Sequence, residues 1–426
     1  MANAVLNSNS SSALVSALDS VSSSVNPFQY SYASKGTLGY SHVPAHARII
    51  SVSETTSPGF GRNNDFAILK SGHLENAFVK MVVKNESGAA ADYNAFIGNL
   101  QVAEIQLITQ GKVICSSKPF GRACLMSDAP YGRKKNQEKG YGLQGSGRHA
   151  DIADDAETTF YVPLGFACFD SPANFIDTNF TEPLVVRVRL EAANTYANAS
   201  ASAFAAVSLS LSSLQLVQIF RMLPSDLEQK TIEANYQEED LVRVMWDLVE
   251  ESSSSTPTAA VSQVLTHTIT TNRCVSKLFI AIEDTITTAG ADTPGSQGIG
   301  DYLELSNIKI EANGQALLDI DAGLIAYMSG TDAGSVNSPN CVGNYWDTSY
   351  SHSQNIYCID FGLLKGTDHF SGMVSARELN NWKVSATSSS STALIATAHN
   401  LRVCMVCPQL ESTSSASGKV STSLSS

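Results

Sequence analysis

The second half of this chain repeats the order of apolar segments found in its first half. Four segment pairs carry the repeat: AFVKMVV around Val79 with KLFIAIE around Phe279, IQLITQGKVI at Gly111 with IKIEANGQALL at Gly314, TTFYVPLGF at Tyr161 with QNIYCIDFG at Tyr357, and SSLQLVQIF at Leu214 with AHNLRVCMV at Leu401. The spacing within a pair varies between 187 and 203 residues, a drift that loop insertions absorb. The pattern predicts two tandem copies of one fold, and it favours an architectural role over catalysis.

The length and composition agree with two packed domains. A chain of 426 residues allows two domains of about 200 residues, each with a core of its own. Charged residues make up only 16% of the chain, against about 25% in a typical protein. Ser, Thr, Asn and Ala take their place, and surfaces of this kind often pack against other protein.

The charge and the cysteines exclude several classes of function. With a net charge of −13, the chain is not expected to bind nucleic acid directly, because phosphate binding requires clustered Lys and Arg. The one dense basic cluster is predicted to be a solvated loop tip; it comprises Arg133, Lys134, Lys135 and Lys139. Several of the eight cysteines lie inside apolar runs, as expected of free thiols in a reducing compartment. No run of 18 apolar residues predicts a membrane-spanning helix, and the N-terminus lacks the pattern of a signal peptide.

The sequence pattern predicts short β-strands over most of the chain. In PLVVRVRLEA, apolar Val186 and Val188 alternate with Arg187 and Arg189, which is the pattern of a half-buried strand. Gly111 follows Gln110 and Gly314 follows Asn313 at predicted tight turns, and Asn-Gly is a strong hairpin signal. Short strands at this spacing with few helices predict an all-β protein made of sandwiches or barrels.

A search of the sequence for chemistry gives no catalytic, cofactor-binding or metal-binding residue. Gly140, Gly142 and Gly145 match G-x-G-x-x-G, but no strand precedes them and no helical run follows, so a loop is the better interpretation. Cys404 and Cys407 form a C-x-x-C within a predicted strand, where they point to opposite faces, and no second pair completes a zinc site. Among the histidines, His42 and His46 are separated by Pro44, which argues against a helical metal pair. We therefore expect neither an enzyme nor a cofactor.

Several of these segments resemble the double jelly-roll major capsid proteins of icosahedral DNA viruses, in the lineage of nucleocytoplasmic large DNA viruses, Polinton-like viruses and virophages. The second half carries IYCIDFGLL, HFSGMVSARELNNWKVSAT and AHNLRVCMV, which are similar to the family's terminal module; the matching positions are Tyr357, Ser371, Gly372, Asn380, Asn381 and Asn400. In the first half, GHLENAFVKMVV, IQLITQGKVI and FYVPLGFACF resemble its early strands. The likeness spans about residues 60–410. The chain departs from the family in the hairpin Gly-Gly, which reads Gln110-Gly111 and Asn313-Gly314, and in its connector, FRMLPSDLEQ.

The resemblance implies two eight-stranded jelly rolls joined by a short helix. The expected organisation is a possibly amphipathic N-terminal arm over 1–27, a first jelly roll over 28–223, a connector helix over 224–235, a second jelly roll over 236–410 and a flexible Ser-rich tail over 411–426. The long loops at 116–159 and 329–353 are expected to decorate the outer surface. Aromatic residues in the second loop would contact either a receptor or a neighbouring subunit; they are Tyr345, Trp346 and Tyr350.

The resemblance also implies a function. The expected protein is a major capsid protein whose homotrimers form pseudo-hexameric capsomers that tile an icosahedral shell in the virion. Implied partners are neighbouring capsomers, minor capsid or penton proteins and an internal membrane reached by the N-terminal arm, with assembly in the host cytoplasm. The alternative is a two-domain carbohydrate-binding or adhesin-like protein, which would require secretion. A β-rich hydrolase ranks third, because no catalytic constellation is present.

Overall fold

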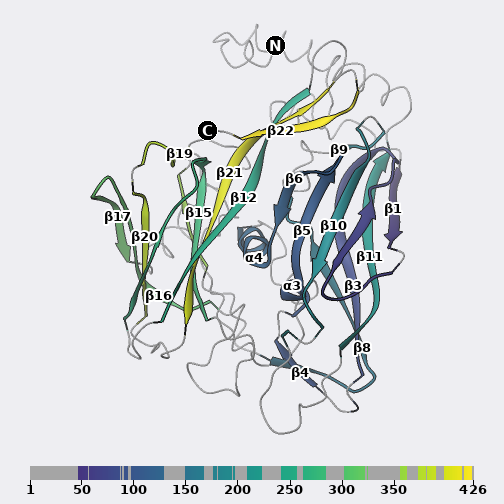
Figure 1. The fold of residues 1–426 in the computed structure, drawn as a ribbon, viewed down its shortest axis with the longest axis horizontal. Coiled ribbons are helices and arrows are strands. Elements are labelled where there is room, and N and C mark those ends of the chain that lie inside the picture. Colours follow the sequence, from purple (N-terminus) through teal and green to yellow (C-terminus); the bar gives the residue numbers. More distant parts are fainter. Residues whose placement is uncertain are drawn as a thin grey trace.

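Two antiparallel β-sandwiches lie side by side in the computed structural model, with a short helix between them (Figure 1). The structure describes residues 47–55, 57–86, 88, 91–94, 97–128, 149–166, 176–179, 181–193, 195–196, 209–222, 241–256, 262–284, 302–321, 324, 356–361, 373–379, 381–389, 398–414 and 417–424. The predicted N-terminal arm and connector helix, at 1–27 and 224–235, lie outside these residues.

The first sandwich has two sheets around one core. Sheet A runs in the order β1 (Ala47–Glu54), β11 (Leu209–Met222), β3 (His73–Asn85) and β8 (Glu157–Pro163), with β9 (Ile176–Asp177) added on β3. Sheet B runs in the order β2 (Asn63–Ala67), β10 (Leu184–Leu190), β5 (Val102–Thr109) and β6 (Lys112–Ser117). The pair β4 (Ala91–Asn94) and β7 (His149–Ile152) and the helices α3 (Ile97–Gln101) and α4 (Pro119–Asp128) complete this half.

The second sandwich repeats this order strand for strand. Sheet C runs through β12 (Leu241–Ser255), β21 (His399–Thr413), β15 (Lys277–Asp284) and β18 (Tyr357–Asp360), with β22 (Val420–Leu424) added on β21. Sheet D runs through β13 (Val264–Thr268), β20 (Lys383–Ser388), β16 (Leu305–Ala312) and β17 (Gln315–Asp321). A short pair, β14 (Cys274–Val275) with β19 (Val374–Ser375), lies beside them. The predicted duplication is confirmed, because all four repeated segments fall on equivalent strands.

Local sequence explains these elements where one face is buried and the other is not. Along β10, Val186 and Val188 are buried while Arg187 points outward, as the alternation predicts. The two predicted hairpins are confirmed in β5–β6 and β16–β17. Both central residues of each turn have positive φ, 47° and 78° at Gln110 and Gly111, and 54° and 75° at Asn313 and Gly314. Paired positive φ values are the geometry that suits the twist of a two-residue hairpin and favours Asn and Gly.

The alignment of the two copies by sequence is one residue out of register on β3 and β15. Val79 pairs with Leu216 and faces the first core, whereas Phe279 pairs with Cys404 on the opposite, outer face of sheet C. The structural counterpart of Phe279 is therefore Phe78. Every residue of KLFIAIE after Lys277 is buried, so the segment lacks the alternation that would have fixed its register.

Two predictions of flexible segments are corrected by the structure. The loop expected over 116–159 contains α4, which is packed against the second core rather than exposed. The tail expected over 411–426 is ordered where the structure describes it, since β21 extends to Thr413 and β22 pairs with it. Composition predicted a loop and a tail because it does not show which distant segment of the chain each of them packs against.

Candidate functional site at the junction of the two sandwiches

The residues weighed for chemistry in the sequence do not form a site in the described structure. The glycine motif at 140–145, the basic cluster at 133–139 and the two N-terminal histidines lie outside the described residues. Cys404 and Cys407 are free thiols buried in the second core, as the sequence predicted. Within the part of the chain that the structure describes, no group of His, Cys, Asp and Glu side chains is arranged to hold a metal ion.

The most developed contact region is the junction between the sandwiches, which is built around α4. This helix follows β6 of the first sandwich, yet Phe120, Ala123 and Cys124 belong to the core of the second. The ring centroids of Phe120 and Tyr302 are 5.4 Å apart, and the thiol of Cys124 contacts that of Cys404 on β21. Helix α4 therefore covers the outer face of sheet C and joins the two cores.

A buried arginine fixes α4 to the first sandwich. Arg122 is fully buried, and its Nε donates to Oδ1 of Asn99 at 2.8 Å. Its terminal nitrogens donate to the carbonyls of Asn99 at 3.0 Å and Ser117 at 3.1 Å, and to the carbonyl of Val102. One guanidinium thus donates to backbone carbonyls of α3, β5 and β6 at the same time.

On its other side, α4 meets β12 of the second sandwich. The N–H of Gly121 donates to Oε1 of Glu250 at 3.0 Å. A Cβ atom at position 121 would lie 2.7 Å from that oxygen and 3.1 Å from Cδ1 of Leu248, so glycine is what allows the helix to approach the strand this closely. The sequence offered no signal for this role beyond a glycine within an apolar run.

Ionised side chains line the same junction. Nε of Arg402 donates to Oε2 of Glu283 at 2.7 Å, and Nη1 of Arg273 lies 2.8 Å from Oδ2 of Asp247. Burial raises the pKa of Asp247, against the opposing effect of Arg273. The side-chain amide of Gln409 also reaches the carbonyl of Ile114 on β6, at 3.5 Å. The contact of Gln409 ties sheet C to the β6 edge of the first sandwich, whereas both ion pairs lie within the second sandwich.

The pKa of Glu250 makes the junction sensitive to pH. Burial raises this pKa, and the N–H of Gly121 and the charges of Lys118, Arg122 and Arg402 oppose the shift only in part. A carboxyl with a raised pKa stabilises the fold fully below its ordinary value of 4.5, and this contribution is lost as the pH rises through the folded pKa. Stability at neutral pH is therefore reduced by the charge on Glu250.

We expect Glu250→Gln to raise the thermal midpoint at pH 7.5 and to leave it nearly unchanged at pH 4. The amide oxygen still accepts from Gly121, while the cost of burying a charge disappears. Thermal unfolding followed by circular dichroism at both pH values measures the difference. Glu157→Gln, on the exposed side of β8, is the matched control. A lower midpoint for Glu250→Gln at pH 7.5 would contradict the assignment.

The C-terminal strand adds a second link across the junction. β22 pairs with β21 over Gln409–Thr413, so it belongs to sheet C of the second sandwich. Val420 at its start nevertheless lies in the core of the first sandwich, and the carbonyl of Gly418 accepts the N–H of Glu182 at 3.0 Å. The end of the chain therefore connects the two halves (Figure 1).

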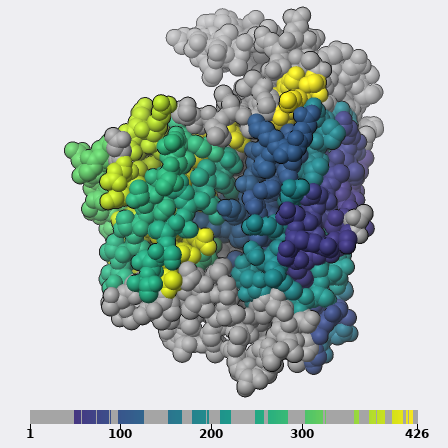
Figure 2. All heavy atoms as spheres, in the orientation of Figure 1, coloured from purple at the N-terminus to yellow at the C-terminus, as the bar shows by residue number. Residues whose placement is uncertain are grey.

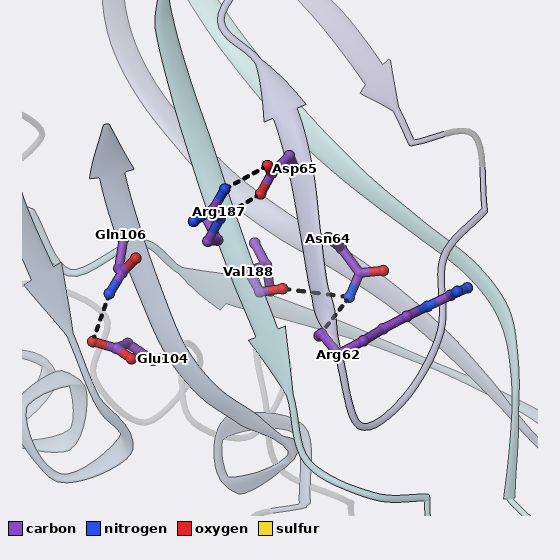
Figure 3. A network of polar contacts seen from close by, with 7 residues as sticks. All are labelled: Arg62, Asn64, Asp65, Glu104, Gln106, Arg187 and Val188. Atoms are coloured by element: carbon purple, nitrogen blue, oxygen red, sulfur yellow. Dashed lines mark hydrogen bonds and ion pairs between the residues drawn. The ribbon is translucent and has the colours of Figure 1, made fainter. Parts of the chain in front are cut away.

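The outer face of sheet B is polar, and its side chains pair with one another (Figure 3). Arg187 donates from Nε and Nη2 to the two carboxylate oxygens of Asp65, both at 2.8 Å. Gln106 donates to Glu104 at 3.0 Å, whereas Asn64 is buried on the other face of β2, where its amide reaches the carbonyl of Val188 at 3.3 Å. The polar groups of such a face form hydrogen bonds with one another and with water.

None of the described helices is long and apolar enough to span a membrane.

Solved structures share this arrangement of paired sandwiches. The PBCV-1 virus capsid has a chain similar to this one with a TM-score of 0.65 at 15% identity, over 89% of this chain and 97% of that chain. This protein has the double jelly-roll fold. The Faustovirus major capsid protein is similar with a TM-score of 0.59 at 10% identity, over 85% and 90% of the two chains. For the mavirus major capsid protein the TM-score is 0.50 at 11% identity, over 92% and 94%.

No protein-family model and no curated protein matches the sequence. The double jelly roll is thus visible in the strand order and not in overall residue identity. The resemblance drawn from the repeated segments is confirmed at the level of fold: each jelly roll has two paths of four strands, to which β9 and β22 each add one short strand. The structures that share it cover 89% and 85% of this chain, so the two jelly rolls together are the comparable unit.

Proposed function

We propose that this protein is a structural major capsid protein that assembles into the shell of an icosahedral virus. The observation that carries the proposal is the pair of jelly rolls with the same strand order, combined with a likeness to viral capsid proteins that covers 89% of this chain and 97% of the PBCV-1 capsid chain. The composition of the chain supports the proposal, because a chain with only 16% charged residues is suited to extensive contact with other protein.

We further propose that three copies form a pseudo-hexameric capsomer. Each chain contributes two similar sandwiches, so a ring of three chains presents six similar units to its neighbours. Such a ring requires heterologous contacts, in which one surface of a chain meets a different surface of the next. The two sandwiches are held together by α4, Arg122 and β22, which lets each chain act as one building block.

Minor capsid or penton proteins, and an internal membrane reached by residues 1–27, are proposed as further partners, with assembly in the host cytoplasm. The apolar spacing of Leu14, Leu18 and Val21 supports contact of this arm with a membrane or another subunit. The net charge of −13 supports a shell that does not bind the genome directly.

The mass of the purified chain in solution tests the proposal. We expect light scattering on a sizing column to give three times the chain mass of 45.3 kDa, and electron microscopy of concentrated material to show shells or flat arrays. A chain that stays monomeric at high concentration would refute the capsomer and bring the carbohydrate-binding alternative forward.

A further inference from the structure

Two buried thiols from different jelly rolls meet at the junction. Cys124 lies on α4, which follows β6 of the first jelly roll, and Cys404 lies on β21 of the second. Both residues are 0% exposed, neither is in a disulfide, and their thiol groups are hydrogen-bonded to each other. Figure 2 shows the first jelly roll (purple and blue) against the second (green) along the middle of the molecule. The thiol pair therefore spans the boundary between the two jelly rolls.

The packing of α4 on sheet C explains why these two thiols meet. The N–H of Gly121 donates to Oε1 of Glu250 at 3.0 Å, which places the start of the helix over β12. Glu250 pairs directly with Cys404 in the register of β12 and β21. Cys124 follows Gly121 by three residues, so both lie on the same face of the helix. The contact that positions Gly121 on Glu250 therefore also positions Cys124 on Cys404.

Cys124 is better placed to bond with Cys404 than are the neighbouring thiols of sheet C. Cys358 lies in the same row of the sheet, but Phe279 stands between them and pairs with both cysteines. Two strand spacings put the Cα atoms of Cys358 and Cys404 about 9–10 Å apart, whereas a disulfide spans at most about 7 Å. Cys407 is three residues from Cys404 on β21 and points to the opposite face. The geometry therefore favours a bond between Cys404 and Cys124.

The closed junction protects the pair from reaction. Burial raises the pKa of Cys124 well above its ordinary value, and the protonated thiol is a poor nucleophile. Oxidation therefore requires α4 to move away from β21 for a short time. The buried charge of Glu250 lowers the stability of the contact between α4 and β12 at neutral pH, which favours such local opening.

We propose that Cys124 and Cys404 form a disulfide that joins the two jelly rolls once the protein leaves a reducing environment, with a small-molecule disulfide such as oxidised glutathione as the oxidant. Sheet C is then covalently attached to α4, which Arg122 in turn holds to the first jelly roll. The bond requires a single chain, so a monomer would form it as well as a capsomer. Both thiols are enclosed, and the disulfide is therefore expected within a chain and not between chains.

The reaction is a thiol–disulfide exchange in two steps. One thiol of the pair loses its proton, and its sulfur attacks the oxidant, which forms a mixed disulfide and releases one small thiolate. The second protein thiol then loses its proton, attacks the mixed disulfide and releases the other small thiolate. The two protons pass to the released thiolates. The protein thiols are thus oxidised to one disulfide, while the small disulfide is reduced to two thiols.

The bond is expected to stabilise the folded protein. It connects residues that are 280 positions apart in the sequence, and cross-links that close long loops restrict the unfolded chain most. We expect the thermal midpoint of the oxidised protein to lie roughly 5 °C above that of the reduced protein, measured by circular dichroism.

Peptide mapping of the full chain tests the pairing. The purified protein is incubated in a buffer dominated by oxidised glutathione or by reduced glutathione, quenched with acid, alkylated and digested for mass spectrometry. We expect a linked peptide pair containing Cys124 and Cys404 in the oxidised sample, and both residues alkylated in the reduced sample. Protein oxidised in urea shows that the linked peptides can be detected. If the folded protein keeps both cysteines alkylatable, or links either one to another residue, the proposal is overturned.

Single substitutions connect the bond to the gain in stability. We expect Cys124→Ala to lose the rise in thermal midpoint on oxidation, whereas Cys274→Ala, at a half-buried thiol on β14, keeps it as the matched control. Circular dichroism in the reduced buffer shows whether each variant folds, and the peptide map of the wild-type chain decides the pairing if Cys124→Ala does not. An equal rise in Cys124→Ala and in the wild type would mean that another oxidation causes it, and would overturn the stabilising role of the Cys124–Cys404 bond.

Discussion

Replacing Arg122 by alanine is expected to lower the free energy of unfolding by about 3–5 kcal/mol, which is among the largest effects that a single substitution has. The guanidinium holds Asn99 Oδ1 and the carbonyls of Asn99, Ser117 and Val102. Without it, buried acceptors lose their donors, and each unsatisfied group costs about 1–3 kcal/mol. The loss should appear as a lower midpoint in urea or thermal unfolding followed by circular dichroism.

Arg187→Ala provides the matched control for Arg122→Ala. Arg187 makes two hydrogen bonds of 2.8 Å to Asp65, but the pair lies on the exposed face of sheet B (Figure 3). Exposed ion pairs contribute about 0–1 kcal/mol. Similar losses for the two variants would show that burial of Arg122 at the junction has no special importance for stability.

Removing residues 415–426 is expected to weaken the connection between the jelly rolls and to destabilise the first one by about 3 kcal/mol. The deletion withdraws Val420 from the first core, and a fully buried Val contributes about 1.5–3 kcal/mol. It also removes the backbone pairing along β21 and the bond from Glu182 to Gly418. We expect thermal unfolding followed by circular dichroism to begin at a lower temperature, as the first jelly roll unfolds. Limited proteolysis should cut the chain faster.

Two spectroscopic signals distinguish the unfolding of the second jelly roll from that of the whole chain in this experiment. All 3 tryptophans, Trp246, Trp346 and Trp382, lie in the second half of the sequence. Their fluorescence therefore reports the second jelly roll, while circular dichroism reports both. A chain lacking only residues 425–426 keeps β22 and should behave as wild type. If the longer deletion unfolds at the wild-type midpoint, Val420 does not link the two halves.

The repeated apolar segments were enough to predict two like β-sandwiches in tandem, because strand-forming patterns and paired turn residues act locally. Gln110-Gly111 and Asn313-Gly314 specify their hairpins through positive φ, and Val186 and Val188 identify a half-buried strand by alternation. A core thiol at Cys404 followed from its apolar surroundings. These features depend on a few neighbouring residues. They are therefore present in both copies, although the spacing between paired segments of the two halves varies.

The junction could not be predicted in the same way. Phe120 and Cys124 lie in a segment whose flanking glycines and charges are typical of a loop, and only the second core shows why they are buried. Arg122 resembles any surface arginine until its carbonyl partners are brought together. The register of β15 was lost because both faces of sheet C are covered, which removes the alternation of polar and apolar residues.

The fold class, the duplication and the lack of a recognisable catalytic motif could all be predicted from the order of the amino acids. Only the packed chain shows that α4 and β22 join the two jelly rolls, and that Ile50 on β1 is exposed while Leu248, at the equivalent position of β12, is buried. The physical reason is that strand and turn preferences are set by adjacent residues. Burial of a side chain is set by whichever distant segment packs on it, so equivalent positions in two copies can be buried in one and exposed in the other.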